Sequence, residues 1–158
     1  MRTVNPSRTA IQRTALSRPV YLALQDGLIS KERTVFDYGC GRGGDLLRLH
    51  EMGVPVSGWD PAFFPDEERT PADVVNLGYV VNVLEDPRER GIVLCAAWAL
   101  TQKVLIVSAR LEWEARRLEG DFHGDGIVTE RSTFQKFFTQ EELRGWIEQT
   151  LGQHCVAA

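Results

Sequence analysis

An aspartate followed by closely spaced glycines is the part of this sequence best suited to chemistry. Residues 35–45 read VFDYGCGRGGD, so Asp37 stands two positions before the first of four glycines. Glycine allows the backbone to adopt left-handed conformations and to approach a ligand closely. Gly39, Gly41 and Gly44 also fit the spacing GxGxxG, which is typical of loops that bind dinucleotide phosphates. The spacing alone leaves the kind of ligand open.

The charge of Asp37 distinguishes between two kinds of ligand. A diphosphate binds to bare amide groups at a helix N-terminus, and a neighbouring carboxylate would repel it. A carboxylate there suits a ligand with an ammonium group, such as the methionine part of S-adenosylmethionine. In the alternative interpretation, Asp37 caps a backbone amide of the turn.

Asp60 is a second acidic residue at the end of a predicted strand. It follows Gly41 by 19 positions and precedes Pro61. A carboxylate at this place can accept hydrogen bonds from both hydroxyls of a ribose, in adenosine cofactors of both kinds. The alternative is a simple Asp-Pro turn.

Apolar patterns predict the elements that position these side chains. β-branched and aromatic runs predict four strands, at 34–38, 54–61, 71–75 and 103–109. Periodic apolar residues, stops and caps predict four helices, in 17–33 with an end near Gly27, in 43–53, in 88–102, and after Thr139, where Glu142 completes a capping box. This alternation predicts an α/β fold, a Rossmann-like, mostly parallel sheet with helices on both faces. The carboxyl ends of its strands would bring the glycines, Asp60, Asn76 and Ser108 to one edge.

Three motifs in this order resemble the class I S-adenosylmethionine-dependent methyltransferases: VFDYGCGRG, GWDP and ADVVNLGYVVNVLEDP. More narrowly, residues 8–150 resemble the methyltransferase family associated with DNA phosphorothioation, bacterial proteins encoded beside systems that put sulfur into the DNA backbone. The resemblance implies S-adenosylmethionine as cofactor and a set of cofactor-binding residues. These are Asp37, Gly39, Gly41 and Gly43 at the methionine end, Asp60 with Pro61 at the ribose, and the backbone of Asn76 and Leu77.

Two departures from the class I pattern affect the expected fold. Only 11 residues separate Asp60 from Ala72, too few for the usual helix and third strand, so we expect a sheet trimmed at the strand-3 edge. The chain reaches GQHCVAA where the usual C-terminal antiparallel hairpin would begin, so we expect that hairpin to be lacking or the chain to be C-terminally truncated. An exposed edge favours a homodimer or a partner protein that covers it.

Catalytic residues are indicated only weakly. The stretch from Asn76 to Tyr79 lies where amino-directed DNA methyltransferases carry Asn-Pro-Pro-Tyr, and there the aromatic ring stacks on a flipped base. The alternative is that Tyr79 begins a helix packed on the cofactor. His123 and Asp125 fall in the loop region after the last strand, where they form either a proton-accepting pair or a polar turn.

The first part of the chain is basic although the whole chain carries a net charge of −4. We expect residues 1–33 to form a basic arm with a cap helix, and residues 34–158 to form the methyltransferase-like core. The arm has arginines and no acidic residue before position 19, namely Arg2, Arg8, Arg13 and Arg18. It suits contact with nucleic acid or a cap over a substrate, and its simpler interpretation is a solvated leader.

Composition limits the cellular setting and the classes of function that remain possible. Three cysteines without CxxC spacing indicate neither a disulfide framework nor a metal site, which favours a reducing cytoplasm. No apolar run is long enough to span a bilayer, so no membrane partner is expected. Two other functions stay open: a methyltransferase-fold module without catalysis that serves binding or assembly, and a nicotinamide-dependent oxidoreductase, against which Asp37 argues.

Overall fold

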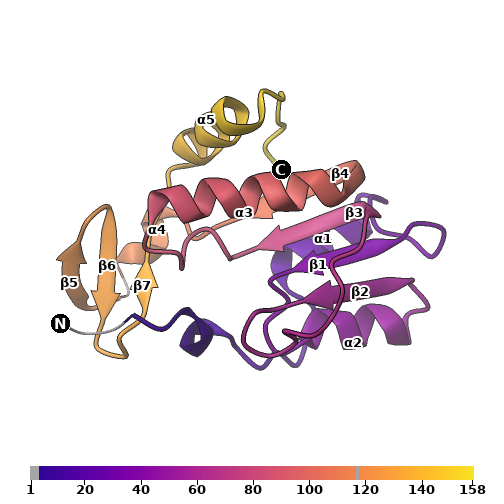
Figure 1. Cartoon of the computed structure of the whole chain (residues 1–158), viewed down its shortest axis with the longest axis horizontal. Coiled ribbons are helices and arrows are strands. Elements are labelled where there is room, and N and C mark those ends of the chain that lie inside the picture. The colour runs from indigo at the N-terminus through magenta and orange to yellow at the C-terminus, as the bar shows by residue number, and fades with distance from the viewer. Residues whose placement is uncertain (1–3, 117) are drawn as a thin grey trace. The chain divides into compact units, whose positions relative to one another are not determined.

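A four-stranded parallel sheet carries the glycine loop (Figure 1). Its strands are β1 (Val35–Tyr38), β2 (Val56–Trp59), β3 (Ala72–Gly78) and β4 (Thr101–Ser108), in the order β2-β1-β3-β4. The computed structural model describes residues 4–116 and 118–158. The predicted α/β class with a parallel, Rossmann-like sheet is confirmed.

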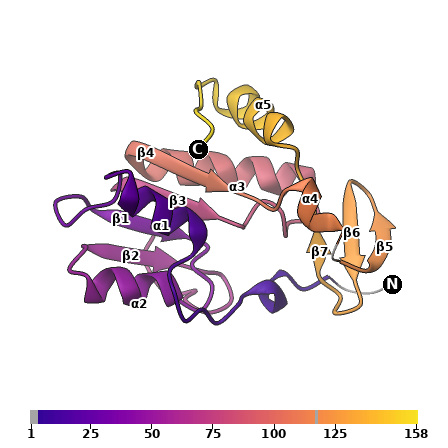
Figure 2. The ribbon, with the colours of Figure 1, turned by 180° about the vertical axis from the view of Figure 1, so that it is seen from behind.

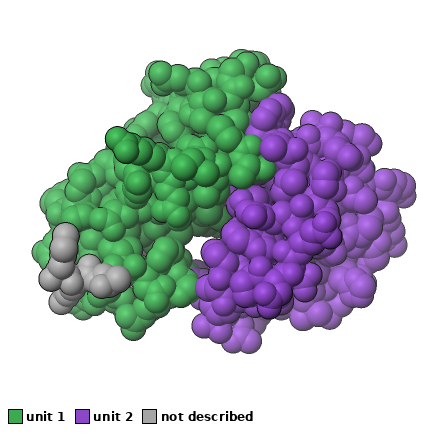
Figure 3. Space-filling model, in the orientation of Figure 1, with its two compact units in different colours: residues 1–9, 79–96, 109–158 green, residues 10–78, 97–108 purple. Residues whose placement is uncertain are grey.

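The chain divides into two compact units (Figure 3). Unit 2 comprises residues 10–78 and 97–108 and contains the parallel sheet. Unit 1 comprises residues 1–9, 79–96 and 109–158. The domain division at residue 33 stays a prediction.

Two helices pack on the sheet of unit 2 through apolar side chains. They are α1 (Arg18–Gln25) and α2 (Gly44–Glu51), and Figure 2 shows α1 passing in front of the sheet. Val20 of α1 and Leu49 of α2 are buried in one cluster with Val35 and Val74 of the sheet. Gly27, with φ of +72°, follows α1, as expected for a residue that ends a helix.

The sheet is trimmed as the short interval after Asp60 predicted. Residues 60–71 form turns and one isolated bridge between Asp60 and Phe64, and they contain neither a helix nor a strand. The next strand, β3, pairs directly with β1. Three prolines in this interval remove backbone donors that a further strand would need.

Unit 1 contains a second sheet, which is antiparallel. Its strands are β5 (Gly120–His123), β6 (Gly126–Thr129) and β7 (Phe134–Gln135). Its helical segments are η1 (Pro6–Thr9), α4 (Glu112–Ala115), α5 (Gln140–Leu151) and most of α3 (Pro87–Leu100), whose last turn belongs to unit 2. Thr139 caps α5 by accepting a hydrogen bond from the amide of Glu142 at 2.9 Å, which is one half of the predicted capping box, while the Glu142 carboxylate pairs with Nζ of Lys136 at 2.8 Å.

Two details differ from the sequence-based expectations. β3 runs to Gly78 rather than Val75, because Asn76, Leu77 and Gly78 stay paired with β4. The region around His123, expected as a loop, is a hairpin in which Gly124 and Asp125 form a two-residue turn. Gly-Asp between two short runs is a hairpin signal that the polar composition of the region obscured.

Residues 152–158, which follow α5, contain no strand. Within the described ranges, no helix has the length and apolar character that crossing a membrane requires.

Candidate functional site

The glycine loop connects β1 to α2 by a sharp turn. The amides of Gly39 and Cys40 donate to the carbonyl of Trp59 at 2.8 and 3.0 Å, which ties the loop to the end of β2. Gly39, Gly41 and Gly43 have φ of +81°, +55° and +77°, values that other residues rarely adopt. The glycines are therefore needed for the course of the backbone, which enters α2 directly after Gly43.

Asp37 lies buried at the end of β1, directly below this loop. Its side chain accepts a hydrogen bond of 2.9 Å from Nδ2 of Asn76, and both residues are almost inaccessible, at 6% and 3% exposure. The pKa of Asp37 is raised to about 7: burial is the main cause, the Asn76 bond partly offsets it, and the charges of Asp45 and Asp60 add to it. An ionised Asp37 therefore needs a compensating positive charge or donor.

The Asp37–Asn76 bond crosses the point where the direction of the sheet reverses. From β1 the chain first adds β2 on one side and then β3 on the other, so β1 and β3 are neighbours at a topological switch point. Asp37 and Asn76 are paired in register there. Open α/β sheets bind ligands outside the carboxyl ends of their strands at such a point.

Asp60 organises the turn after β2 and also holds the glycine loop. Its Oδ2 accepts from the amide of Gly41 at 2.9 Å, and its Oδ1 accepts from the amides of Ala62 and Phe63 at 2.9 and 3.1 Å. Pro61 lies exposed in the same turn. Oδ2 has one protein donor and so keeps a lone pair for another.

The remaining predicted cofactor residues lie at the end of β3. The side chain of Leu77 is fully buried, so only its backbone can face a ligand. The side chain of Asn76, by contrast, is part of the polar set with Asp37, a role that the sequence analysis did not assign. The signal was available only from strand pairing, because 39 positions separate the two residues.

Residues 10–17 of the basic arm run beside the glycine loop. The Cβ of Ala10 lies 3.5 Å from the position that a side chain at Gly41 would take. The amide of Ser17 donates to Asp45 at 2.7 Å, in the first turn of α2. Of the arginines proposed for nucleic-acid contact, Arg8 and Arg18 are exposed, Arg13 is partly buried, and Arg2 lies outside the described residues.

Cys40 is not suited to act as a nucleophile. Burial and the charges of Asp37 and Asp60 raise the pKa of its thiol to about 12. The reactive form of cysteine is the thiolate, which this environment suppresses. We therefore interpret Cys40 as a small residue that fits between the glycines of the loop, without a role in the reaction.

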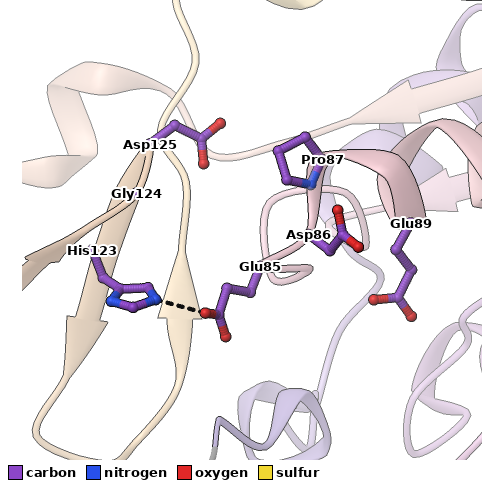
Figure 4. A pocket seen from close by; sticks show the side chains of 7 residues that line it. All are labelled: Glu85, Asp86, Pro87, Glu89, His123, Gly124 and Asp125. Atoms are coloured by element: carbon purple, nitrogen blue, oxygen red, sulfur yellow. Dashed lines mark hydrogen bonds and ion pairs between the residues drawn. The ribbon is translucent and has the colours of Figure 1, made fainter.

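The catalytic candidates lie in unit 1. Tyr79 follows β3 and has a left-handed backbone with φ of 58°. The structure does not pair His123 with Asp125. Instead, Nε2 of His123 lies 2.6 Å from Oε1 of Glu85, and Figure 4 shows the ring directed at Glu85.

Asp125 forms ion pairs with two buried basic side chains. Arg90 donates to its two carboxylate oxygens at 2.6 and 2.9 Å, and Nζ of Lys136 lies 3.3 Å away. The hydrogen bond from Arg90 is the main cause that lowers the pKa of Asp125 to about 2. Such a carboxylate is a weak base at neutral pH, and its structural role is to neutralise Arg90.

His123, Glu85 and Asp125 line an open pocket of about 550 Å³ within unit 1 (Figure 4). Asp86, directly before α3, and Pro87 and Glu89, in its first turn, also line the pocket. The pocket thus combines a histidine–carboxylate pair with a negative wall. Groups of three or more side chains able to hold a metal ion are absent from the described ranges.

Comparisons with known proteins identify the fold. No family model and no curated protein matches the chain. Among solved structures, the 1,6-didemethyltoxoflavin-N1-methyltransferase of Burkholderia thailandensis, with bound 1,6-didemethyltoxoflavin and S-adenosylhomocysteine, aligns with a TM-score of 0.59 and 18% identity over 92% of this chain. The alignment covers 66% of that enzyme, so this chain spans less than two thirds of its length.

Two further structures give the same result. The CcbJ methyltransferase of Streptomyces caelestis aligns with a TM-score of 0.59 and 14% identity, over 84% of this chain and 77% of its own. An S-adenosylmethionine-dependent methyltransferase of Clostridium acetobutylicum aligns with a TM-score of 0.55 and 9% identity, over 90% and 82%. At such identities the likeness establishes the fold, that of the class I S-adenosylmethionine-dependent methyltransferases.

Proposed function

We propose that this chain is an S-adenosylmethionine-dependent methyltransferase. The observation that carries the proposal is the buried carboxylate of Asp37, bonded to Asn76 across the switch point between β1 and β3. A ligand ammonium group beside Asp37 would compensate the charge that burial disfavours. Open α/β sheets bind ligands at this edge, and a carboxylate there favours a positively charged group.

The neighbouring groups fit the same cofactor. Gly39, Gly41 and Gly43 allow a close approach of the methionine part, and the free lone pair on Oδ2 of Asp60 can accept from a ribose hydroxyl. The backbone at Asn76 and Leu77 lines the same edge. When bound, S-adenosylmethionine supplies a methyl group on a positively charged sulfur.

A nicotinamide dinucleotide fits this loop less well. Its diphosphate would meet the carboxyl groups of Asp37, Asp45 and Asp60, and the charges of Asp45 and Asp60 already raise the pKa of Asp37. We expect the protein to bind S-adenosylhomocysteine. Titration with NADH should give no change in fluorescence.

Methyl transfer is a displacement that requires positioning, and a base only when the acceptor must lose a proton. His123 stays a candidate for that proton transfer, and Glu85 lies within hydrogen-bond distance of its ring and orients it. Tyr79 is assigned to contact with the acceptor.

The finer proposal is membership of the methyltransferase family associated with DNA phosphorothioation, with a cytoplasmic location. Its support is the resemblance of residues 8–150 and the basic arm with Arg8, Arg13 and Arg18. Fluorescence anisotropy with duplex DNA should give a binding constant that falls with salt. Replacing these three arginines by glutamine should flatten that slope, whereas the same change at Arg88, Arg116 and Arg131 should not; equal slopes for both variants would contradict the role of the arm.

A second candidate function is a module that binds the cofactor and a partner without catalysis. It is favoured by the trimmed sheet and by β4, which has one strand neighbour within its four-stranded sheet. A second copy of the chain or a partner protein would then pair with β4. Cofactor binding without transfer of a labelled methyl group to DNA, RNA or a cell extract would favour this function.

Calorimetry with S-adenosylhomocysteine tests the main proposal. The wild-type protein should bind it, and Asp37→Asn, which keeps the shape but loses the charge, should bind at least tenfold more weakly. Asp26→Asn, on the exposed end of α1, is the matched control and should bind like the wild type. A folded wild-type protein that gives no heat of binding would refute the proposal.

A further inference from the structure

Residues 10–15 lie against the glycine loop, on the side to which side chains at Gly41 and Gly44 would point. A Cβ added at Gly41 would lie 3.5 Å from the Cβ of Ala10. A Cβ added at Gly44 would lie 3.5 Å from the Cβ of Arg13 and 3.7 Å from its carbonyl oxygen. This segment, called the strap below, therefore packs directly on the loop proposed to bind the methionine part of the ligand.

The chain is firmly held where the strap ends. Leu16 packs against the apolar cluster that joins the sheet to α1 and α2. The amide of Ser17 donates to Oδ1 of Asp45 at 2.7 Å, and Ser17 directly precedes the first residue of α1. The chain is thus anchored in unit 2 from Leu16 onward.

The strap itself is held loosely. All six of its residues are described, and they form neither a helix nor a strand. Most of its side chains are exposed, namely those of Ile11, Gln12, Thr14 and Ala15. The carbonyl of Ala10 accepts from Nε of Arg42 at a long 3.4 Å. Segments with exposed backbone and few buried apolar contacts open at a low cost in free energy, so the strap can leave the loop while Leu16 stays in place.

We propose that the strap is a gate, which closes over the glycine loop and has to open before the ligand can enter or leave. The inference rests on the proposed function, because it concerns access to that same cofactor site. A gate of this kind slows entry and exit by the same factor. It therefore sets how long the ligand stays bound and leaves the dissociation constant nearly unchanged.

A disulfide between the strap and α2 tests the gate directly. The distance of 3.5 Å between the Cβ of Arg13 and a Cβ at Gly44 lies within the range of disulfides. The double variant Arg13→Cys, Gly44→Cys is made in a background in which Cys40, Cys95 and Cys155 are replaced by alanine. Oxidation locks the strap and a thiol reductant releases it, so the reduced form of the same protein is the reference.

Locking the strap should slow both rate constants for S-adenosylhomocysteine at least tenfold relative to the reduced form. Stopped-flow tryptophan fluorescence measures association after oxidation of the free protein. Displacement of radiolabelled ligand measures dissociation after oxidation of the complex. The dissociation constant should change less than threefold, since it is the ratio of the two rate constants. The single variant Arg13→Cys in the same background should give equal rates when oxidised and when reduced.

A second variant tests the gate without a crosslink. Ala15→Gly lies in the exposed part of the strap and increases the conformational freedom of the open state. Both rate constants should therefore rise about threefold. Ala157→Gly, which is also exposed, is the matched control and should leave both unchanged. Should the crosslink not form, or the double variant not fold, Ala15→Gly carries the comparison.

The outcomes are distinct. Slowing of both rate constants by the lock, or acceleration of both by Ala15→Gly, supports the gate. Equal rates for the locked and the reduced protein, or a change in dissociation alone, overturn the gate and leave the proposed function intact. Failure of the folded wild-type protein to bind S-adenosylhomocysteine overturns both.

Discussion

Nδ2 of Asn76 donates a hydrogen bond of 2.9 Å to Oδ1 of Asp37, and this bond joins neighbouring strands at the switch point of the sheet. It is the sole side-chain hydrogen bond that supports the buried carboxyl group among the bonds of the described residues. One neutral donor compensates only part of the cost of burying a charge. The ionisation of Asp37 is therefore coupled to stability and to ligand binding.

Asp37→Asn should change how stability depends on pH. Burial raises the pKa of Asp37 from 3.8 to about 7, so between these values the folded state holds a proton that the unfolded state has lost. The wild-type protein should therefore lose stability from pH 4 to pH 7 relative to the variant, by up to about 4 kcal/mol. Urea unfolding of both proteins at several pH values measures the difference, which should be constant above pH 7. A difference that does not vary with pH would contradict the ionisation of Asp37 in this range.

Ligand binding should release a proton at pH 6. The free protein holds Asp37 largely protonated there, and a ligand ammonium group beside it favours the carboxylate. The heat of binding of S-adenosylhomocysteine should then depend on the ionisation enthalpy of the buffer. Asp37→Asn should remove that dependence wherever its binding is still measurable. Identical heats in phosphate and Tris would show that Asp37 keeps its proton.

Gly43→Ala should destabilise the protein. Gly43 has φ of +77°, and an added Cβ would lie 3.2 Å from the ring of Phe64. The left-handed backbone alone costs a non-glycine residue about 1–2 kcal/mol. Gly145→Ala is the matched control: it lies in α5 with open space around it and should stabilise by up to about 1 kcal/mol. Thermal unfolding should move in opposite directions for the two variants, and a shift of the same sign would contradict the conformation of the loop.

Asp125→Asn and His123→Gln should separate a structural role from a catalytic one. Asp125 holds Arg90, whose side chain is 4% exposed, so its loss should destabilise by about 1–2 kcal/mol at pH 7, reduced by solvent at the half-exposed carboxylate. Because the pKa of Asp125 is lowered to about 2, this effect should shrink as the pH falls from 4 to 2.

His123 pairs with Glu85 at the surface, and its replacement should change stability by less than about 0.5 kcal/mol. Equal melting temperatures for Asp125→Asn and the wild type would contradict the ionic role.

Local patterns in the sequence determined most of the parallel fold. The strands and helices around the glycine loop follow from apolar periodicity and from glycine stops, which act over a few residues. The same holds for Asp37 and Asp60, because each lies next to the last residue of a strand whose carboxyl end can be predicted. The short interval after Asp60 also sufficed to predict the trimmed edge.

Partners that lie far apart in the sequence were decided only by the tertiary structure. Asn76 meets Asp37 through strand pairing, and His123 meets Glu85 rather than Asp125 because a two-residue turn forms the tip of a hairpin. The spacing of residues in the chain carries no information on such contacts, since they depend on register and on which strands become neighbours. The sequence by itself therefore determined which residues could bind a cofactor. The tertiary structure decided which of their polar atoms are already bonded within the protein and which stay available to a ligand.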